Sequence, residues 1–437
     1  MRRHALNGVW VISGKVLAIV AGVLANAMLT RLMSPEEVGI YFLMISIASV
    51  AVLFAQAGQN QAAVRFIARL RGQGLAASAG SVVIKAFLIA GSASLMMAVC
   101  YAFFVELLGY PLFHSELMVV GSLWVAAWIV LNALRALAAE CLRGLEEIRL
   151  ATLFEGLFSS LLFALLLLFV WLNRQDISLY QVIVITTCSA LLSMLFALYS
   201  LGRRVVPLSS HGPVGVKELL RTGLPLLGGN IVVVLMTSLG LWVVGYLGTA
   251  EDAAQYGAAA RVMLLAQFPL LALNAMLPPM IARIHAEGNI QEMERVVRLA
   301  ASVALLGSGL VMLVFLFWGG DLLALLFGSF YADARWILVF LCIGVVANAW
   351  SGFCGPVLMM TGYHNELVRM SLWAASATLL ATWVLGRSFG SEGVALAMSV
   401  GMIVLHLLMW LAVRRHIAIW THAGGMLRFV MAYFASR

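Results

Sequence analysis

Charge is scarce in this chain of 437 residues, since only 11% of them are Asp, Glu, Lys or Arg and 63% are hydrophobic. A soluble domain carries roughly 25% charged residues, which it needs to cover a surface that faces water. The composition therefore excludes a soluble globular protein. It predicts an all-α integral membrane protein, because each crossing of the hydrocarbon takes about 20 apolar residues in a helix.

Paired cysteines and metal-binding patterns are also missing. All five cysteines fall in or at the ends of apolar runs, and no two of them form a CxxC pair. We expect them to be small packing residues without a disulfide or metal role. No nucleophile–base arrangement is visible either, so we expect no enzyme activity, no catalytic residue, no metal and no cofactor.

A complete nucleotide-binding motif is absent as well. The stretch "GVWVISGKV" contains Gly8 and the pair Gly14-Lys15, but five residues separate them and Val16 follows the lysine. A phosphate loop has four intervening residues and then Ser or Thr. We predict no nucleotide hydrolysis, so Lys15 has to be explained as a charge within an apolar helix.

Twelve apolar segments are long enough to be predicted as membrane-spanning helices. They are about 9–32, 37–63, 79–105, 117–141, 150–172, 178–201, 219–247, 254–282, 299–318, 334–360, 367–387 and 393–413. Nineteen of the 27 Lys and Arg residues lie on the side shared by the N-terminus and the even-to-odd loops, and only four lie on the other side. The bias predicts that both termini are cytoplasmic. The net charge of +8 fits anionic lipid at the inner leaflet, and we expect no nucleic-acid partner.

An internal repeat appears when the chain is shifted by about 215 residues. The segment "NGVWVISGKVLAIVAGVLANAMLTRLMSPEEVGIY" (7–41) aligns with "TGLPLLGGNIVVVLMTSLGLWVVGYLGTAEDAAQY" (222–256), and "FIARLRGQG" (66–74) aligns with "MIARIHAEG" (280–288). Each aligned segment stands at the start of a block of six predicted spans. Because six is even, the two halves should have the same orientation in the membrane, and they should enclose a cleft, as in carriers built of parallel repeats. We predict a six-helix lobe at 1–202, a cytoplasmic linker at 203–218, a second six-helix lobe at 219–413 and a cytoplasmic amphipathic tail at 414–437.

Several motifs, in order along the chain, resemble the polysaccharide transporter family. They include "TRLMSPEEVGIYFL", "LLRTGLPLLGGNIV", "AQYGAAARVMLLAQFPLLALNAMLPPMIARIHAEG", "LMMTGYHNE" and "GSEGVALAMSV". The family holds O-antigen and exopolysaccharide flippases, in the superfamily of multidrug/oligosaccharidyl-lipid/polysaccharide (MOP) exporters that includes multidrug and toxin extrusion (MATE) carriers. The resemblance implies a MATE-like fold of twelve helices in two lobes. It also implies movement of an undecaprenyl-diphosphate-linked oligosaccharide across the bacterial cytoplasmic membrane by alternating access.

Cations inside predicted spans are the first candidates for binding a diphosphate, because a charge in the membrane is costly and marks function by default. Arg261, within "YGAAARVML", is the strongest of them, with a structural ion pair as the alternative. Lys15 either binds the anion or extends its long stem to the membrane surface. Its repeat partner is Asn230, which is also polar and also follows a glycine.

Further polar residues could line the path of the sugar. Asn26 lies about three helical turns after Lys15 on the same face, and Arg31 ends that helix either as a ligand or as an interfacial anchor. Arg135 and Glu155, in adjacent spans, either pair with each other or flank the entrance to the cavity. Gln59 belongs to "QAGQNQ" (56–61), which either lines the sugar path or caps a frayed helix end. Glu155 and His406 are possible residues for coupling transport to an ion, and packing within the structure is the alternative role for His406.

Two other functions compete with the flippase. A MATE-type drug or cation antiporter would need carboxylates inside the membrane, and spans one and seven contain neither Asp nor Glu. A glycan polymerase or ligase would carry a large periplasmic loop, which the sequence lacks. As partners we expect the lipid-linked oligosaccharide and membrane lipid, with a glycan polymerase and a chain-length regulator as candidates, and we expect the protein to be a monomer.

Overall fold

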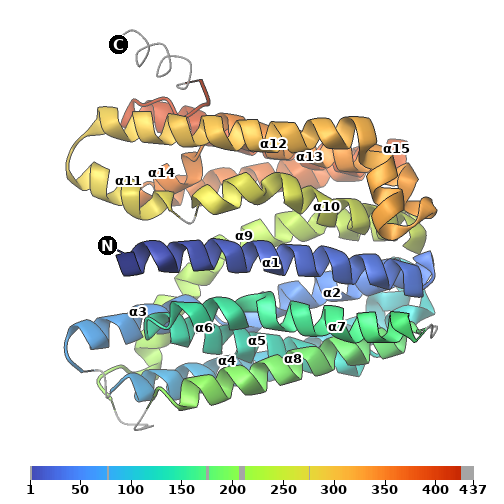
Figure 1. Cartoon of the computed structure of the whole chain (residues 1–437), viewed down its shortest axis with the longest axis horizontal. Coiled ribbons are helices and arrows are strands. Elements are labelled where there is room, and N and C mark those ends of the chain that lie inside the picture. The colour runs from blue at the N-terminus through green and yellow to red at the C-terminus, as the bar shows by residue number, and fades with distance from the viewer. Residues whose placement is uncertain (1, 76–77, 174–176, 206–211, 275, 425–437) are drawn as a thin grey trace. The chain divides into compact units, whose positions relative to one another are not determined.

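The computed structural model describes residues 2–75, 78–173, 177–205, 212–274 and 276–424, with the backbone alone at 2–9, 12, 228–230 and 232–233. These described residues form helices and turns, with no strand among them (Figure 1). The first helices are α1 (Arg2–Leu32), α2 (Pro35–Ala55), α3 (Gln59–Gly72), α4 (Ala79–Phe113), α5 (Ser122–Gly144), α6 (Ile148–Thr152), a π-helical segment (Leu153–Leu157), α7 (Phe158–Leu172) and α8 (Leu179–Gly202). They are followed by α9 (Val216–Leu247), α10 (Ala250–Asn274), α11 (Leu277–Ala286), α12 (Ile290–Phe327), the 3-10 helix η4 (Ser329–Ala334), α13 (Arg335–Ser351), α14 (Cys354–Met360) and α15 (His364–Ile417).

The all-helical membrane fold is confirmed, while the count of twelve crossings stays a prediction. Within the described residues, ten helical stretches are long and apolar enough to cross a membrane. One of them, α15, holds both of the last two predicted spans in 54 residues. At 1.5 Å per residue it would be about 80 Å long, far more than the bilayer core of about 30 Å. It bends at Gly390, whose φ of 59° and ψ of −144° suit only glycine.

The second predicted span, 37–63, is interrupted in the structure. α2 ends at Ala55 and α3 begins at Gln59, and both Ala57 and Gly58 take positive φ values between them, 48° and 69°. A Cβ built on Gly58 would lie 2.0 Å from the carbonyl oxygen of Gly223 in α9. Glycine is required here both by the backbone conformation and by this close approach. The polar "QAGQNQ" sequence thus begins in a turn at 56–58 and continues into the start of α3.

The repeat is visible in how its two halves start their second helix. Ser34 caps α2, and its side chain and that of Glu37 form a reciprocal capping box. At the positions shifted by 215 residues, Thr249 and Asp252 make the same reciprocal bonds at the start of α10, at 2.9 and 3.2 Å. A capping box satisfies two backbone donors that a helix start leaves open, so the duplicated sequence specifies the same local structure twice.

The helices gather into two compact units, Met1–Ala254 and Gln255–Arg437. In the first unit α5 packs against α2, α4 and α8, and α9 packs against α2 and α3. In the second unit α13 packs against both α12 and α15. The division into lobes at 1–202 and 219–413, with a linker at 203–218 and a tail at 414–437, stays a prediction. Residues 206–211 of that linker and 425–437 of that tail lie outside the described residues.

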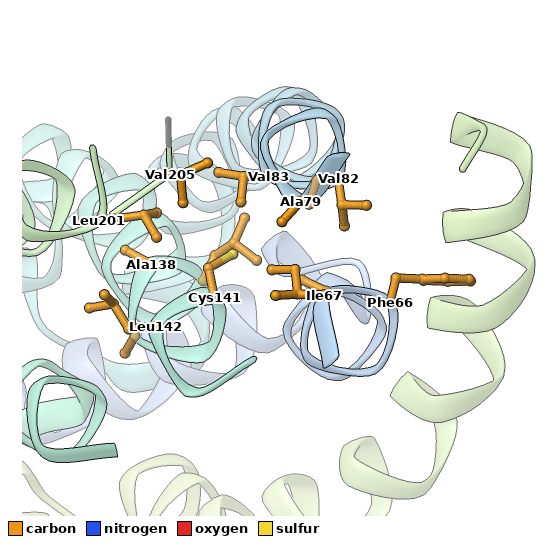
Figure 2. Packing of buried hydrophobic residues seen from close by; sticks show 14 of the residues in the cluster. Phe66, Ile67, Ala79, Val82, Val83, Ala138, Cys141, Leu142, Leu201 and Val205 are labelled. Carbon is orange, nitrogen blue, oxygen red and sulfur yellow. The ribbon is translucent and has the colours of Figure 1, made fainter. Parts of the chain in front are cut away.

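A buried apolar cluster fixes the end of α5 in the first unit. Figure 2 shows Ala138, Cys141 and Leu142 of α5 beside Ile67 of α3 and Leu201 of α8. Ala151 of α6 and Phe154 of the π-helical segment belong to the same cluster. Close packing of this kind leaves little room for a helix to shift. The cluster therefore holds α5, α6 and the π-helical segment together at the place where charged side chains meet.

Candidate functional site

Lys15 lies where α1 comes very close to α6. Gly14 precedes it, and a Cβ built on Gly14 would lie only 2.6 Å from Cγ2 of Thr152. Any larger residue would push the two helices apart, because atoms in a packed interior already touch. One turn earlier, Nε1 of Trp10 donates to the carbonyl oxygen of Arg149 at 3.4 Å. α1 therefore runs along α6 and α7 (Figure 1), and this places Lys15 opposite the π-helical segment.

Glu155 contacts two cations from two different helices. Its Oε1 atom lies 3.7 Å from Nζ of Lys15, and its Oε2 atom accepts a hydrogen bond of 2.8 Å from Nη2 of Arg143. Arg143 also donates through Nη1 to Oε1 of Glu140 at 2.6 Å. We call Lys15, Glu140, Arg143 and Glu155 the ion cluster. Its two positive and two negative charges balance.

The backbone that carries Glu155 is held by a buried arginine. Glu155 lies in the π-helical segment, and such segments disturb the regular hydrogen bonding of a helix and often mark functional sites. Nη1 of Arg135 donates to the carbonyl oxygen of Phe154, while Nε and Nη2 donate to Oδ1 of Asn132 at 3.3 and 2.8 Å. Arg135 is only 8% exposed. Its guanidinium therefore positions the residue next to Glu155 in the chain.

The ion cluster is accessible and lies near one end of three candidate spans. The side chains of Lys15, Arg143 and Glu155 are 48%, 34% and 39% exposed. Lys15 lies close to the start of the span Ser13–Leu32, and Glu155 lies about 10 Å along the helix from the start of the span Ile148–Leu172. By the predicted topology this is the cytoplasmic end. An anionic headgroup entering from that side would meet two cations that share the carboxylate of Glu155.

Two members of the ion cluster were not among the residues expected from the sequence. Arg143 and Glu140 form an ion pair and lie three residues apart on α5. That spacing on a predicted helix is the signal that could have found them. Between the described side chains of Arg135 and Glu155 the structure shows no ion pair. Glu155 pairs with Lys15 and Arg143, whereas Arg135 donates to neutral oxygens.

The turn between α2 and α3 buries a second group of polar atoms. Gln59 is fully buried, and its Nε2 donates to the carbonyl oxygen of Ala57 at 3.1 Å. Its Oε1 and the Oδ1 of Asn60 are buried without a hydrogen-bond partner. The amide nitrogen of Gln59 thus caps the turn in which it lies. The oxygens Oε1 of Gln59 and Oδ1 of Asn60 remain as acceptors for a hydroxyl donor. A role of Gln59 in the sugar path stays a prediction.

Arg261 lies in the second unit, eleven residues after the start of α10. Its Nη1 donates to the carbonyl oxygen of Gly257, one turn earlier in the same helix, at 2.9 Å, and its side chain is half-buried. Near the start of the helix Gln255 donates to the carbonyl oxygen of Phe330, so α10 contacts η4 there. The structure thus places Arg261 within an apolar helix, as predicted, and its contact with a diphosphate stays a prediction.

The remaining predicted residues have local partners or lie outside the description. Nδ2 of Asn26 donates to the carbonyl oxygen of Gly22 at 2.6 Å, and Arg31 is exposed in the last turn of α1. Nδ1 of His406 contacts the carbonyl oxygen of Met402 at 2.8 Å, the local contact expected of a packing histidine. The side chain of Asn230 lies outside the described residues. Among the side chains that are described, no group of three His, Cys, Asp or Glu could hold a metal ion.

Sequence comparison decides the family. The profile of the family described as "Polysaccharide biosynthesis protein" matches residues 5–285, which is more than half of the chain and includes α1 from residue 5 onward, α2 to α10 and the ion cluster. This chain belongs to that family. The resemblance inferred from the motifs is thereby confirmed. A search of curated protein sequences gave no match.

Solved structures show the same fold at low sequence identity. An inward-facing multidrug resistance MATE family transporter of the MOP superfamily matches with a TM-score of 0.77 and 18% identity, over 92% of this chain and 94% of that one. The lipid II flippase MurJ in an inward closed conformation matches with a TM-score of 0.72 and 14% identity, over 93% and 87%. A MOP superfamily transporter from Pyrococcus furiosus, with a binding pocket of reverse polarity, matches with a TM-score of 0.63 and 17% identity, over 94% of each chain. The chain therefore has the fold of MOP superfamily transporters.

Proposed function

We propose that this protein is a flippase that moves a lipid-linked oligosaccharide across the cytoplasmic membrane of a bacterium for the synthesis of O-antigen or exopolysaccharide. The lipid carrier is a polyprenyl diphosphate of the undecaprenyl type, and transport proceeds by alternating access. Membership of a polysaccharide biosynthesis family supports the glycan, and the MOP transporter fold supports transport. The transporter fold favours a carrier over a glycan polymerase or ligase.

The accessible cations of the ion cluster are the observation that carries the proposal. A diphosphate-linked lipid must present its negative charge to the protein within the membrane, where an uncompensated charge is costly. Lys15 and Arg143 lie against one carboxylate at the predicted cytoplasmic end of the helices, which is the end where such a lipid would be loaded. Arg261 is proposed as a further contact of the diphosphate. Asn26, Arg31, Gln59 and Asn230 are proposed contacts of the headgroup and its sugars.

The proposed setting is the bacterial inner membrane with both termini in the cytoplasm. The charge bias of the loops supports it, since positively charged loops stay on the cytoplasmic side. Single cysteines at position 176 (Asp176→Cys) and position 211 (His211→Cys) test it with a membrane-impermeant thiol reagent in intact cells. We expect labelling at 176 and not at 211, and the reverse pattern would contradict the orientation. A glycan polymerase and a chain-length regulator are the proposed partners of a monomeric carrier.

Depletion of the protein in its own host tests the transport of lipid-linked glycan. We expect the lipid-linked oligosaccharide to accumulate in the cytoplasmic leaflet, where it is protected from a glycan-cleaving enzyme added to intact cells. Surface polysaccharide should fall at the same time. A host that keeps normal surface polysaccharide and shows no accumulation after depletion would contradict the proposed function.

A MATE-type antiporter of drugs or cations is the second candidate. Glu140 and Glu155 favour it, because carboxylates inside a membrane segment are the usual ligands of coupling ions. The two functions differ in the charge of the cargo. A panel of cationic dyes loaded into cells that express the protein separates them: dye efflux that depends on a proton or sodium gradient and is lost in Glu155→Gln would favour the antiporter over the flippase.

A further inference from the structure

We infer that Glu155 is an internal counter-anion, which holds Lys15 and Arg143 in the substrate-free protein and is displaced by the diphosphate of the substrate. The inference rests on the proposed function, because it takes the ligand to be a diphosphate. It assigns to Arg143 a part in binding and to the carboxylate of Glu155 a part in release. Arg135 becomes a positioning residue that acts through Glu155.

The contacts of Glu155 are those that an anionic ligand would make. One carboxylate oxygen faces Nζ of Lys15 at 3.7 Å, and the other accepts from Nη2 of Arg143 at 2.8 Å. A diphosphate offers more oxygen atoms and more negative charge to the same two cations. The planar guanidinium of Arg143 can bind two phosphate oxygens at once, and the ammonium of Lys15 adds a point charge. The cations are therefore already arranged for a larger anion than the one they hold.

The charge balance of the ion cluster requires an exchange and not a simple addition. Lys15 and Arg143 are neutralised by Glu140 and Glu155, so an entering diphosphate would meet a neutral cluster with a carboxylate between the two cations. Glu140 forms an ion pair with Arg143 and acts on Lys15 only through space, whereas Glu155 lies within 4 Å of both cations. Movement of Glu155 alone would free Lys15 and the Nη2 side of Arg143, while Nη1 of Arg143 stays bonded to Glu140. The side chains of these ion pairs are 34–48% exposed, so an entering anion can reach them.

The backbone around Glu155 leaves space for that movement. Next to it, a Cβ built on Gly156 would meet no atom within 4 Å, so there is open space beside this part of the π-helical segment. On the other side, the carbonyl of Phe154 is held by Arg135, which is buried. The backbone at Glu155 is therefore held in place, and its side chain can change rotamer so that the carboxylate moves away from the two cations. Return of the carboxylate would then help to expel the diphosphate after transport.

The test is a binding measurement on the purified full-length protein in lipid nanodiscs, with farnesyl diphosphate as the probe and farnesol as the uncharged control. Glu155→Gln should bind farnesyl diphosphate at least about tenfold more tightly than the parent protein, because loss of a competing charge-assisted bond is worth roughly that factor. Lys15→Gln and Arg143→Gln should each weaken binding. Farnesol binding should be the same in all of them.

Two further variants separate displacement from a simple change in electrostatic potential. Glu140→Gln removes an equal charge from the same cluster, yet we expect it to change the affinity much less than Glu155→Gln does. Glu155→Asp keeps the charge but shortens the side chain by one methylene, so it should lose its reach to Lys15 and also bind the probe more tightly. Equal gains in Glu140→Gln and Glu155→Gln, with no gain in Glu155→Asp, would overturn the inference.

Transport and folding readouts keep this test distinct from that of the proposed function. Glu155→Gln should bind tightly but export glycan more slowly in the host, because release is impaired, and its thermal unfolding midpoint should stay near that of the parent. A parent protein that exports glycan while Glu155→Gln shows unchanged or weaker probe binding would refute the counter-anion and leave the flippase intact. Tighter probe binding in Glu155→Gln by a protein that moves no lipid-linked glycan would refute the flippase instead.

Discussion

The ion cluster and Arg261 place positive charge in apolar helices in two different ways. Lys15 and Arg143 are compensated by Glu155 of a π-helical segment, and Arg143 also by Glu140 of its own helix. Arg261 donates to the carbonyl of Gly257 in its own regular helix. At the ion cluster a ligand has to displace a carboxylate, whereas the bond from Arg261 to Gly257 is made to a neutral carbonyl. We therefore expect the two regions to differ in how they respond to mutation.

The largest effect should come from the buried arginine beside the ion cluster. Arg135→Ala would leave the carbonyl of Phe154 and Oδ1 of Asn132 without their donor, at about 1–3 kcal/mol for each stranded buried acceptor. Thermal unfolding and size-exclusion chromatography of the purified variant should show a strongly destabilised protein. Arg261→Ala is the matched control, since it removes the same group from α10 and should leave the amount of folded protein near normal. Equal loss in both variants would remove the distinction between the two regions.

Next in size is the effect of Arg261 on transport. Arg261→Ala should abolish glycan export at normal protein abundance, because a guanidinium–diphosphate contact shielded from water contributes about 1.5–3 kcal/mol. Arg261→Lys keeps the charge without the planar fork and should restore export only in part. Surface polysaccharide and membrane abundance are measured together in the complemented host. Normal export by Arg261→Ala would show that Arg261 is not needed to bind the diphosphate, and the ion cluster would be the remaining candidate for the anion site.

A smaller effect should follow from a methyl group between α1 and α6. Gly14→Ala puts its Cβ 2.6 Å from Cγ2 of Thr152, so α1 has to move and Lys15 with it. Such overpacking typically costs about 1–3 kcal/mol. Thr152→Ser removes that methyl group and keeps the hydroxyl that donates to Ile148. We expect Gly14→Ala to lower stability and export, and the double variant to regain both, while absence of rescue would show that the close approach of α1 is not what matters.

The smallest effect on stability should come from Lys15 itself. Its ion pair with Glu155 is 3.7 Å long and only partly buried, so it should contribute little to the stability of the fold. Lys15→Gln should therefore leave the thermal unfolding midpoint almost unchanged and still reduce glycan export, with Lys217→Gln as an exposed lysine control outside the ion cluster. A large loss of stability in Lys15→Gln would make the lysine a structural residue.

Short-range sequence patterns predict much of the fold and less of the candidate site. The duplicated caps, Ser34 with Glu37 and Thr249 with Asp252, follow from short-range hydrogen bonding that a sequence displays directly. The sequence did not predict the interruption of the helix at Gly58, because it depends on the close approach of Gly223, which is 165 residues away in the chain. A run of apolar residues says how long a helix is, but not where another backbone forces it to turn.

The ion cluster shows the same limit for function. Composition and spacing identified Lys15 and Glu155 as unusual charges, because each costs energy in an apolar helix. Which charges pair depends on the π-helical segment, and no sequence pattern in Leu153–Leu157 predicts it. That segment turns Glu155 toward Lys15 and Arg143 and leaves the carbonyl of Phe154 for Arg135. The pairing is thus a property of the packed helices and not of residue spacing.

Reconstituted transport is the most direct test of the central claim, that the protein flips a diphosphate-linked lipid. The purified protein would be placed in liposomes with a fluorescent short-chain polyprenyl diphosphate sugar, and the fraction exposed outside would be read by quenching with a membrane-impermeant reductant. We predict protein-dependent flipping of the diphosphate-linked lipid, reduced in Lys15→Gln and Arg261→Ala, and none of a matched lipid without phosphate. No flipping above empty liposomes, or equal flipping of both lipids, would contradict the account.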